Sequence, residues 1–379
     1  MPSTTTVRPF RIDVAEDVLT DLRTRLTGTR WPEAETVEDW SQGMPLAYTR
    51  ELAEYWRDHY DWRSRESNLN RFAQFTTLID GLDIHFIHQR SPHADAFPLL
   101  ITHGWPGSVA EFAYLIGPLT DPTAHGGRAE DAFHVVCPSL PGFGFSGKPV
   151  NTGWGVEAIA RAWATLMGRL GYRRYGAHGG DWGSVITTAL GRNPGGCAAI
   201  HLTMPVAAAP DQDGDETDAG REAEALNHYQ QWESGYQKLQ ATRPQTIGYG
   251  LVDSPVAQLA WIVEKFRSWT DCDGHPENAV SRDALLDNVM LYWVTGTGAS
   301  AARLYWESSG AAFASDAFVS LPTGVAAFPK EIIRCPRRWC ERVYHITHWT
   351  DMSRGGHFAA LEQPDLLAAD VRDFFSAVR

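Results

Sequence analysis

The spacing of hydrophobic residues changes along the chain, and the first pattern covers the N-terminal extension. Apolar side chains recur at helical spacing from Val18 and again from Tyr48, which predicts two amphipathic helices. Segments of alternating apolar and polar residues then flank Asp80-Gly81, a dipeptide typical of a tight hairpin. We therefore predict a small α+β extension over residues 1–92.

Short apolar runs that alternate with amphipathic helices follow this extension. Leu99–Thr102 and His134–Cys137 have the pattern of buried strands, residues 156–170 carry a helical apolar stripe, and Tyr172–His178 reads as the next strand. Such alternation is typical of a mostly parallel sheet with helices on its faces. We predict the first part of an α/β core over residues 93–205.

The alternation then stops for about a hundred residues. A polar stretch, Asp211–Asp218, is followed by helical segments rich in Tyr and Trp, and we interpret residues 206–320 as an inserted helical cap. A strand at 342–347 and a helix at 364–378 restore the pattern, so the second part of the core covers residues 321–379. The predicted fold class is α/β, a mostly parallel sheet flanked by helices, with an N-terminal α+β extension and an inserted cap.

Composition and charge exclude several classes of protein. The 379 residues, 43% of them hydrophobic, suffice for one large core. The net charge of −13 is spread along the chain, which argues against a nucleic-acid partner. No stretch approaches the roughly 18 apolar residues that cross a bilayer, and the first residues lack an apolar signal core. We therefore expect a cytoplasmic protein without a membrane anchor. The five cysteines are scattered, so we predict neither a disulfide framework nor a metal site, and we expect no cofactor.

Gly179-Gly180-Asp181-Trp182-Gly183 lies between a predicted strand and a predicted helix. It has the form of the nucleophile elbow of α/β-hydrolases, with Asp181 in place of serine. Such a turn strains its central residue, and a nearby Cβ would collide with the chain, which explains the glycines. An aspartate that only caps the following helix is the alternative. No Gly-x-Ser-x-Gly motif elsewhere competes for the role.

His103-Gly104-Trp105-Pro106-Gly107-Ser108 directly follows a predicted strand. This is the place where α/β-hydrolases carry the second donor of their oxyanion hole. The backbone N–H groups of Trp105 and Trp182 are the expected pair of donors. A Gly-Pro turn of purely structural importance is the alternative.

His357, within Arg354–Phe358, lies on the loop between the last predicted strand and the last helix. This fold carries its base there, and the chain order nucleophile, acid, histidine would be satisfied. A histidine base needs a carboxylate that holds its tautomer and stabilises the imidazolium. Glu331 and Asp351 are both candidates, and either could be a surface charge, so spacing alone does not decide between them.

An aspartate nucleophile indicates alkyl transfer. Its carboxylate, with a reference pKa of about 3.9, is ionised at neutral pH and attacks without a base. Displacement at a saturated carbon gives an alkyl ester of Asp181, and His357 then activates the water that attacks the ester carbonyl. Epoxides and alkyl halides both fit, but an epoxide leaves as an alkoxide and needs a proton donor. Tyrosines of the predicted cap can supply it, although lid tyrosines more often pack. They are Tyr229, Tyr236, Tyr249, Tyr292 and Tyr305.

These motifs together resemble the microsomal-type epoxide hydrolases, a branch that includes the juvenile-hormone epoxide hydrolases of insects. The resemblance covers nearly the whole chain, including a block similar to the family's N-terminal epoxide hydrolase domain. It rests on Tyr55-Trp56, Tyr60–Arg63, Leu69–Phe72, Ile79–His88, His103–Ser108, Gly179–Gly183, Leu321–Glu331 and Arg354–Phe358.

The resemblance implies roles for individual residues. Glu331 follows Phe-Pro as the acid of the family does, so the resemblance favours it over Asp351. The implied site consists of the nucleophile Asp181, the base His357, the acid Glu331, the ring-opening tyrosines Tyr236 and Tyr305, and the oxyanion-hole donors Trp105 and Trp182.

The implied function is epoxide hydrolysis to a vicinal diol, with a small-molecule epoxide as the partner. The substrate would be either a xenobiotic or a biosynthetic, natural-product epoxide. Many eukaryotic members begin with a membrane-anchoring helix, which we do not expect here. A homodimer is a further family-level expectation. Haloalkane dehalogenation and a catalytically inactive binding protein are the alternative functions.

Overall fold

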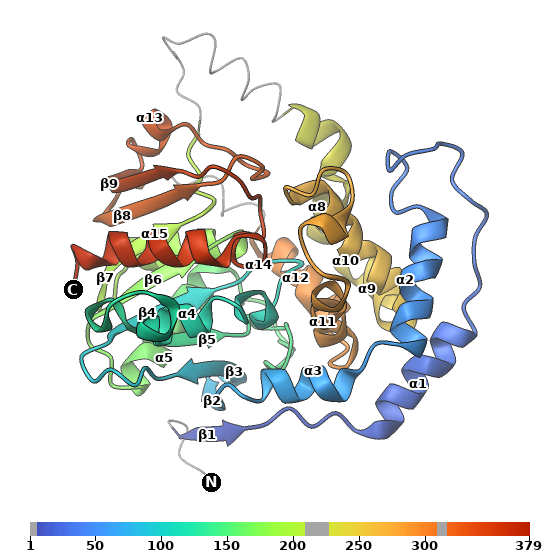
Figure 1. Ribbon diagram of the computed structural model, residues 1–379, viewed down its shortest axis with the longest axis horizontal. Helices are drawn as coiled ribbons and strands as arrows, with labels where there is room; N and C mark the ends of the chain where they lie inside the picture. Colours follow the sequence, from blue (N-terminus) through green and yellow to red (C-terminus); the bar gives the residue numbers. More distant parts are fainter. Residues whose placement is uncertain (1–5, 209–226, 309–316) are drawn as a thin grey trace.

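A nine-stranded sheet lies at the centre of the computed structural model, which describes residues 6–208, 227–308 and 317–379 (Figure 1). The strands are β1 (Val7–Phe10), β2 (Gln74–Ile79), β3 (Leu82–Gln89), β4 (Phe97–Thr102), β5 (Phe133–Pro138), β6 (Tyr175–Gly179), β7 (Cys197–Leu202), β8 (Val319–Ala327) and β9 (Tyr344–Asp351). Their order is β1-β2-β3-β5-β4-β6-β7-β8-β9. Neighbours from β5 to β9 run parallel, whereas β1, β2, β3 and β5 pair antiparallel. The predicted mostly parallel sheet is confirmed.

The hairpin predicted at Asp80-Gly81 connects β2 to β3. Ile79 and Leu82 are paired in register on either side of the turn. Both turn residues have a left-handed conformation, with φ of 48° at Asp80 and 81° at Gly81. A two-residue hairpin turn of this type requires positive φ at both positions, which Asp-Gly tolerates. The hairpin forms the antiparallel side of the sheet next to β5.

The strands of the core agree with the apolar runs in some places and not in others. β4 and β5 contain the predicted strands. β6 begins only at Tyr175, because Gly171, with φ of 85°, follows the end of the preceding helix and residues 172–174 are irregular. Three strands, β7 and β8 of the core and β1 of the extension, were not predicted. In β8 the apolar pattern is interrupted by Pro322 and Gly324, close to irregular pairing with β9.

Helices cover both faces of the sheet. α4 and α15 pack together on one face, and α5 packs with α6 on the other (Figure 1). No helix in the described parts of the chain is both long enough and apolar enough to cross a membrane. The core helices are α4 (Ile116–Thr120), α5 (Val156–Arg169), α6 (Trp182–Arg192), α13 (Arg337–Cys340), α14 (Ala359–Glu362) and α15 (Pro364–Ser376).

A set of helices lies between the two parts of the core in the sequence, as predicted for the cap. The polar stretch Asp211–Asp218 lies outside the described residues, and the exact borders of the cap stay a prediction. The cap helices are η4 (Tyr229–Glu233), α8 (Gly235–Thr242), α9 (Pro244–Asp253), α10 (Pro255–Trp269), η5 (Pro276–Asn278), α11 (Arg282–Trp293) and α12 (Gly298–Ser308).

The N-terminal extension braces this cap from outside. Its helices are α1 (Glu16–Thr27), α2 (Leu46–Asp58) and α3 (Trp62–Leu69), and α1 and α2 both pack on α10 (Figure 1). Three of its tyrosine hydroxyls donate hydrogen bonds of 2.7–2.9 Å to carboxylates of the cap. Bonds to ionised acceptors are stronger than neutral ones, so they hold the cap in a defined position. The pairs are Tyr48–Glu277, Tyr55–Asp283 and Tyr60–Asp287.

Candidate active site

Asp181 occupies a sharp turn between β6 and α6. Its φ of 50° and ψ of −130° are strained for a residue with a side chain. The flanking glycines allow the turn, because a Cβ on Gly179 would lie 2.2 Å from the oxygen of Gly183, and one on Gly183 would lie 1.9 Å from the oxygen of Thr102. The Asp181 side chain makes no capping hydrogen bond to α6. It is therefore presented away from the helix, as a nucleophile elbow requires.

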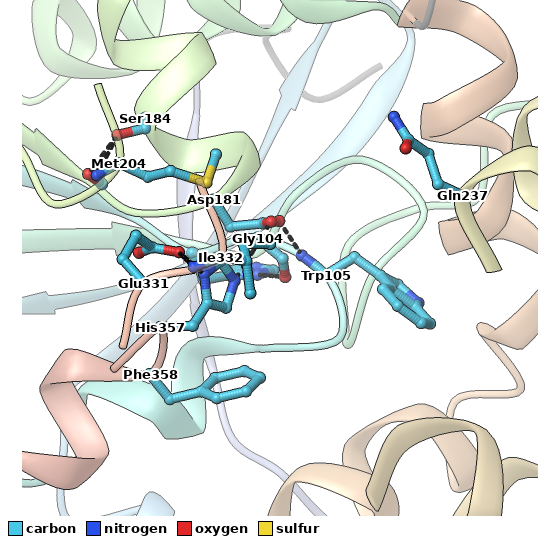
Figure 2. Close-up of polar contacts among 12 residues, drawn as sticks. Gly104, Trp105, Asp181, Ser184, Met204, Gln237, Glu331, Ile332, His357 and Phe358 are labelled. Carbon is cyan, nitrogen blue, oxygen red and sulfur yellow. Dashed lines mark hydrogen bonds and ion pairs between the residues drawn. The ribbon is translucent and has the colours of Figure 1, made fainter. Parts of the chain in front are cut away.

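The loop after β4 contacts the carboxylate of Asp181. The backbone N–H of Trp105 donates to Oδ1 of Asp181 at 2.7 Å (Figure 2). Gly104 is needed for this approach, since a Cβ there would lie 2.0 Å from the same oxygen. Helix α11 supports the loop from the cap side, where the Tyr292 hydroxyl donates to the oxygen of Gly107 at 2.8 Å. One of the two expected oxyanion-hole donors thus already binds the carboxylate.

His357 lies between two carboxylates. Its Nε2 is 3.3 Å from Oδ2 of Asp181, and its Nδ1 is 2.6 Å from Oε1 of Glu331 (Figure 2). The rival carboxylate, Asp351, is exposed at the end of β9 and accepts a hydrogen bond from the indole of Trp349. The structure therefore brings Asp181, Glu331 and His357 together and leaves Asp351 outside the cluster.

The charge state of His357 follows from these neighbours. Burial favours the neutral imidazole, but the negative charges of Glu331 and Asp181 and their hydrogen bonds outweigh burial. The net effect raises the pKa of His357 well above its ordinary value. The imidazolium is therefore the stable form as long as both carboxylates are ionised.

Tyr236 and Tyr305 belong to the cap and lie near Asp181, whose charge acts on both phenols. Both side chains are buried, and their rings lie 5.8 Å apart at 83°. The ring of Trp105 stacks on Tyr236 at 4.9 Å, while Tyr305 stands edge-on to Trp182 at 4.8 Å. Burial raises the pKa of each phenol well above its ordinary value, and the charge of Asp181 adds to this effect. Both phenols are therefore neutral proton donors near Asp181.

Of the other three tyrosines of the cap, two have hydroxyls that donate to other groups, and the third is exposed. The Tyr229 hydroxyl lies 3.0 Å from that of Tyr236 and donates to Oε1 of Gln237 at 3.1 Å. Burial raises the pKa of Tyr229 to about 12. Tyr292 holds the loop after β4, and Tyr249 is 70% exposed. The structure thus separates the five tyrosines that the sequence left together.

Three residues near this cluster were missed by the sequence analysis. Glu111, in η1 (Val109–Phe112), is half-buried near the cluster, and burial raises its pKa to about 8 although the charge of His357 opposes this. Trp269 accepts a hydrogen bond from the backbone N–H of His357 and packs edge-on against its ring at 5.0 Å. Lys265 lies one helical turn before Trp269 on α10. None belongs to a contiguous motif, and only Glu111 stands close to one, three residues after Ser108.

Metal-ligand clusters are not found in the described parts of the chain, where no group of three or more His, Cys, Asp or Glu side chains could hold an ion. The groups that the site presents are carboxylates, an imidazole, phenols and backbone amides.

Comparison with known proteins gives similarity along the whole chain. A family model described as "Epoxide hydrolase N terminus" matches residues 7–112, and one described as "alpha/beta hydrolase fold" matches residues 98–243. A Stigmatella aurantiaca protein named "Putative epoxide hydrolase" is 55% identical over 98% of this chain and 86% of its own length. Epoxide hydrolase 1 of Sus scrofa is 38% identical over 97% of this chain and 88% of its own. The structure of Aspergillus niger epoxide hydrolase has a TM-score of 0.89 at 32% identity, covering 99% of this chain and 97% of that one.

Proposed function

The chain belongs to the microsomal-type epoxide hydrolase family, and we propose that it turns an epoxide into a vicinal diol through a covalent ester on Asp181. The observation that carries the proposal is the environment of one carboxylate. Oδ1 of Asp181 accepts the N–H of Trp105, Oδ2 lies 3.3 Å from Nε2 of His357, and the buried phenols of Tyr236 and Tyr305 are close enough for the charge of Asp181 to raise their pKa.

Ring opening uses the free oxygen of the nucleophile. Since Oδ1 is held by Trp105, Oδ2 of Asp181 forms the bond to an epoxide carbon. The C–O bond of the ring breaks, and its electron pair goes to the epoxide oxygen. Tyr236 and Tyr305 bind that oxygen, and one of them supplies the proton. An alkoxide is a poor leaving group in a buried site, so general-acid assistance of this kind accelerates the step.

Ester hydrolysis uses the same residues in other roles. Alkylation removes the charge of Asp181, so one of the two carboxylates that raise the pKa of His357 is lost. His357 then gives up its proton, which returns to the phenolate left by ring opening, and the neutral imidazole becomes the base that activates water, while Glu331 holds its Nδ1–H. The oxyanion forms on Oδ1, where the N–H of Trp105 already points, and Trp182 is the second proposed donor.

Isotope labelling tests the covalent scheme. Water attacks the carbonyl carbon of the ester. In the first turnover the oxygen added to the epoxide therefore comes from Asp181, and the oxygen of water stays in the regenerated carboxylate. A single turnover in ¹⁸O-water is expected to place the label in the peptide that contains Asp181, as measured by mass spectrometry. Label found only in the diol after that first turnover would rule the ester out.

Haloalkane dehalogenation is separated from this function by the tyrosines. A halide leaves without a proton, whereas an alkoxide needs one. Tyr305→Phe is therefore expected to slow ester formation from an epoxide by about 100-fold, while ester formation from an alkyl bromide changes less than about threefold. Equal losses with both substrates would remove the proton-donor role from Tyr305.

The remaining proposals concern substrate, assembly and location. The substrate is either a xenobiotic or a biosynthetic epoxide, and a panel of aryl, alkyl and polycyclic epoxides with chiral product analysis would distinguish them. We also keep the homodimer and the cytoplasmic location as predictions. Light scattering of the purified chain tests the first, and fractionation of its native host tests the second.

A further inference from the structure

A lysine ammonium lies over the ring of Tyr236. Lys265 belongs to α10, and only 5% of its surface is exposed. Its Nζ is 4.8 Å from the centroid of the Tyr236 ring and 5.8 Å from that of Trp269, and it is paired with the carboxylate of Glu264. A cation at such a distance is attracted by the negative face of an aromatic ring.

Burial of this lysine is costly and needs a reason. Lysines are almost never fully buried unless they are paired, because desolvation of the ammonium disfavours the charged form. The flanking buried positions of α10, Val263 and Phe266, are apolar, and an apolar side chain at position 265 would fill the same space. The ion pair with Glu264 does not explain the burial of Lys265 either, since Glu264 itself is partly exposed. The interaction with the rings is what distinguishes position 265.

We propose that Lys265 is a positioning residue for ring opening, and that its ammonium stabilises the negative charge that develops on the phenol of Tyr236 as the proton moves to the epoxide oxygen. This inference rests on the proposed role of Tyr236. When the O–H bond of Tyr236 breaks, its electron pair remains on the phenolate, whose charge spreads into the ring. A cation over the ring interacts more strongly with the phenolate than with the neutral phenol, so it lowers the barrier.

Burial and the carboxylate of Asp181 oppose this charge and raise the pKa of Tyr236. The phenols of Tyr229 from η4 and Tyr305 from α12 also lie beside Tyr236. Lys265 from α10 supplies the opposite charge, partly compensated by Glu264. The effects that raise the pKa keep Tyr236 protonated before the reaction, and the cation of Lys265 makes its proton available during ring opening.

Pre-steady-state kinetics of charge variants test the proposal. With styrene oxide as the probe, Lys265→Met should slow formation of the Asp181 ester about tenfold, which corresponds to one cation–π interaction in a desolvated site. Hydrolysis of the ester should change less than about twofold, because Tyr236 gives its proton in the first step. Lys265→Arg, which keeps the charge, should restore most of the rate. Lys238→Met removes an exposed lysine of α8 and serves as the matched control.

A double-mutant cycle with Tyr236→Phe decides whether Lys265 acts through Tyr236. If it does, Lys265→Met adds no further loss in the Tyr236→Phe background. An equal loss in both backgrounds, or no loss in either, overturns the inference while the role of Tyr236 stands. A Tyr236→Phe enzyme that forms the ester at the wild-type rate refutes the proposed role of Tyr236 and the inference with it. Lys265→Gln, polar and uncharged, replaces Lys265→Met if the latter does not fold.

Discussion

Two buried clusters in the core combine histidine with a carboxylate, and only one has the properties of an active site. In the first, Nδ1 of His357 lies 2.6 Å from Glu331, next to Asp181. In the second, Nε2 of His201 lies 2.8 Å from Asp370. Residue type, burial and distance are nearly the same in both. The difference lies in how the oxygens of the carboxylates are used.

Asp370, on α15, is saturated with hydrogen bonds. One oxygen accepts from His201 of β7, and the other accepts from His348 and Thr350 of β9. His178 of β6 contacts the far side of the His201 ring. The carboxylate therefore joins two strands directly, and a third through His201, to one helix, and both of its oxygens already accept hydrogen bonds.

The first cluster keeps unused hydrogen-bonding capacity. Oδ2 of Asp181 lies 3.3 Å from Nε2 of His357, a longer distance than the 2.6 Å between Nδ1 and Glu331. Oε2 of Glu331 is buried and has no hydrogen-bond partner among the described residues. An unsatisfied buried acceptor costs stability, and such cost is typical of functional sites. A histidine and a carboxylate in contact thus indicate catalysis only when the cluster also presents a reactive atom on a strained turn, as Asp181 is presented.

Replacement of Asp181, the proposed nucleophile, tests the catalytic role of the first cluster. It should give the largest loss of activity of the substitutions considered. Asp181→Asn cannot form the ester, so we expect a loss of activity of at least about 1,000-fold. Asparagine tolerates positive φ, so the free energy of unfolding should change by less than about 1 kcal/mol. The pKa of His357 should fall, because one of its two carboxylates becomes neutral. Product assays, urea unfolding and NMR titration of the imidazole measure the three quantities.

Replacement of Asp370, the saturated carboxylate, should have the opposite result: it should lower the stability and leave the activity nearly unchanged. Asp370→Asn leaves donors of β7 and β9 without their anionic acceptor, so we expect a loss of ~3 kcal/mol in the free energy of unfolding at pH 7. The turnover of the folded variant at low temperature should stay within about threefold of the wild type. A variant that keeps its stability and loses its activity would contradict the distinction between the clusters.

The pH dependence of this loss has a defined sign. Although burial opposes it, the hydrogen bonds from His201, Thr350 and His348 lower the pKa of Asp370 in the folded state. The stabilisation is therefore present above the unfolded pKa of about 3.9 and is lost as the pH falls towards the folded pKa. Urea unfolding of wild type and Asp370→Asn should give the largest difference near pH 7 and converging values at acidic pH.

The sequence predicted the functional cluster better than the structural one, because its parts are contiguous. The elbow around Asp181 and the loop of Trp105 are local motifs whose glycines can be recognised without a fold. The choice of Glu331 over Asp351 depends on where the ends of β8 and β9 lie, so spacing could not make it and only the resemblance favoured it.

The parts that were not predicted depend on contacts between distant elements. Asp370 meets β7 and β9 only after the sheet has formed, and β7 itself lacked a clear pattern. Lys265 and Trp269 reach the site from one face of α10, where the sequence shows ordinary helix residues. The pattern of the sequence identified the tyrosines of the cap but did not show which of them lie at the site. The exposure of Tyr249 and the burial of Tyr236 follow from packing.

Glu111, a half-buried carboxyl group near the first cluster, sharpens the comparison, because it is neither saturated like Asp370 nor one of the three residues Asp181, Glu331 and His357. Burial raises its pKa from the ordinary 4.5 to about 8, so the folded state holds a proton that the unfolded state releases. The stabilisation that depends on this proton is intact below about pH 4.5 and is lost as the pH rises through 8. Glu111→Gln removes this pH-dependent loss of stability. The free energy of unfolding of the variant should therefore equal that of the wild type near pH 5 and exceed it by ~2 kcal/mol at pH 9. Unfolding midpoints in urea at both pH values measure the difference, and a gain of equal size at pH 5 would show that packing, not charge, is its cause.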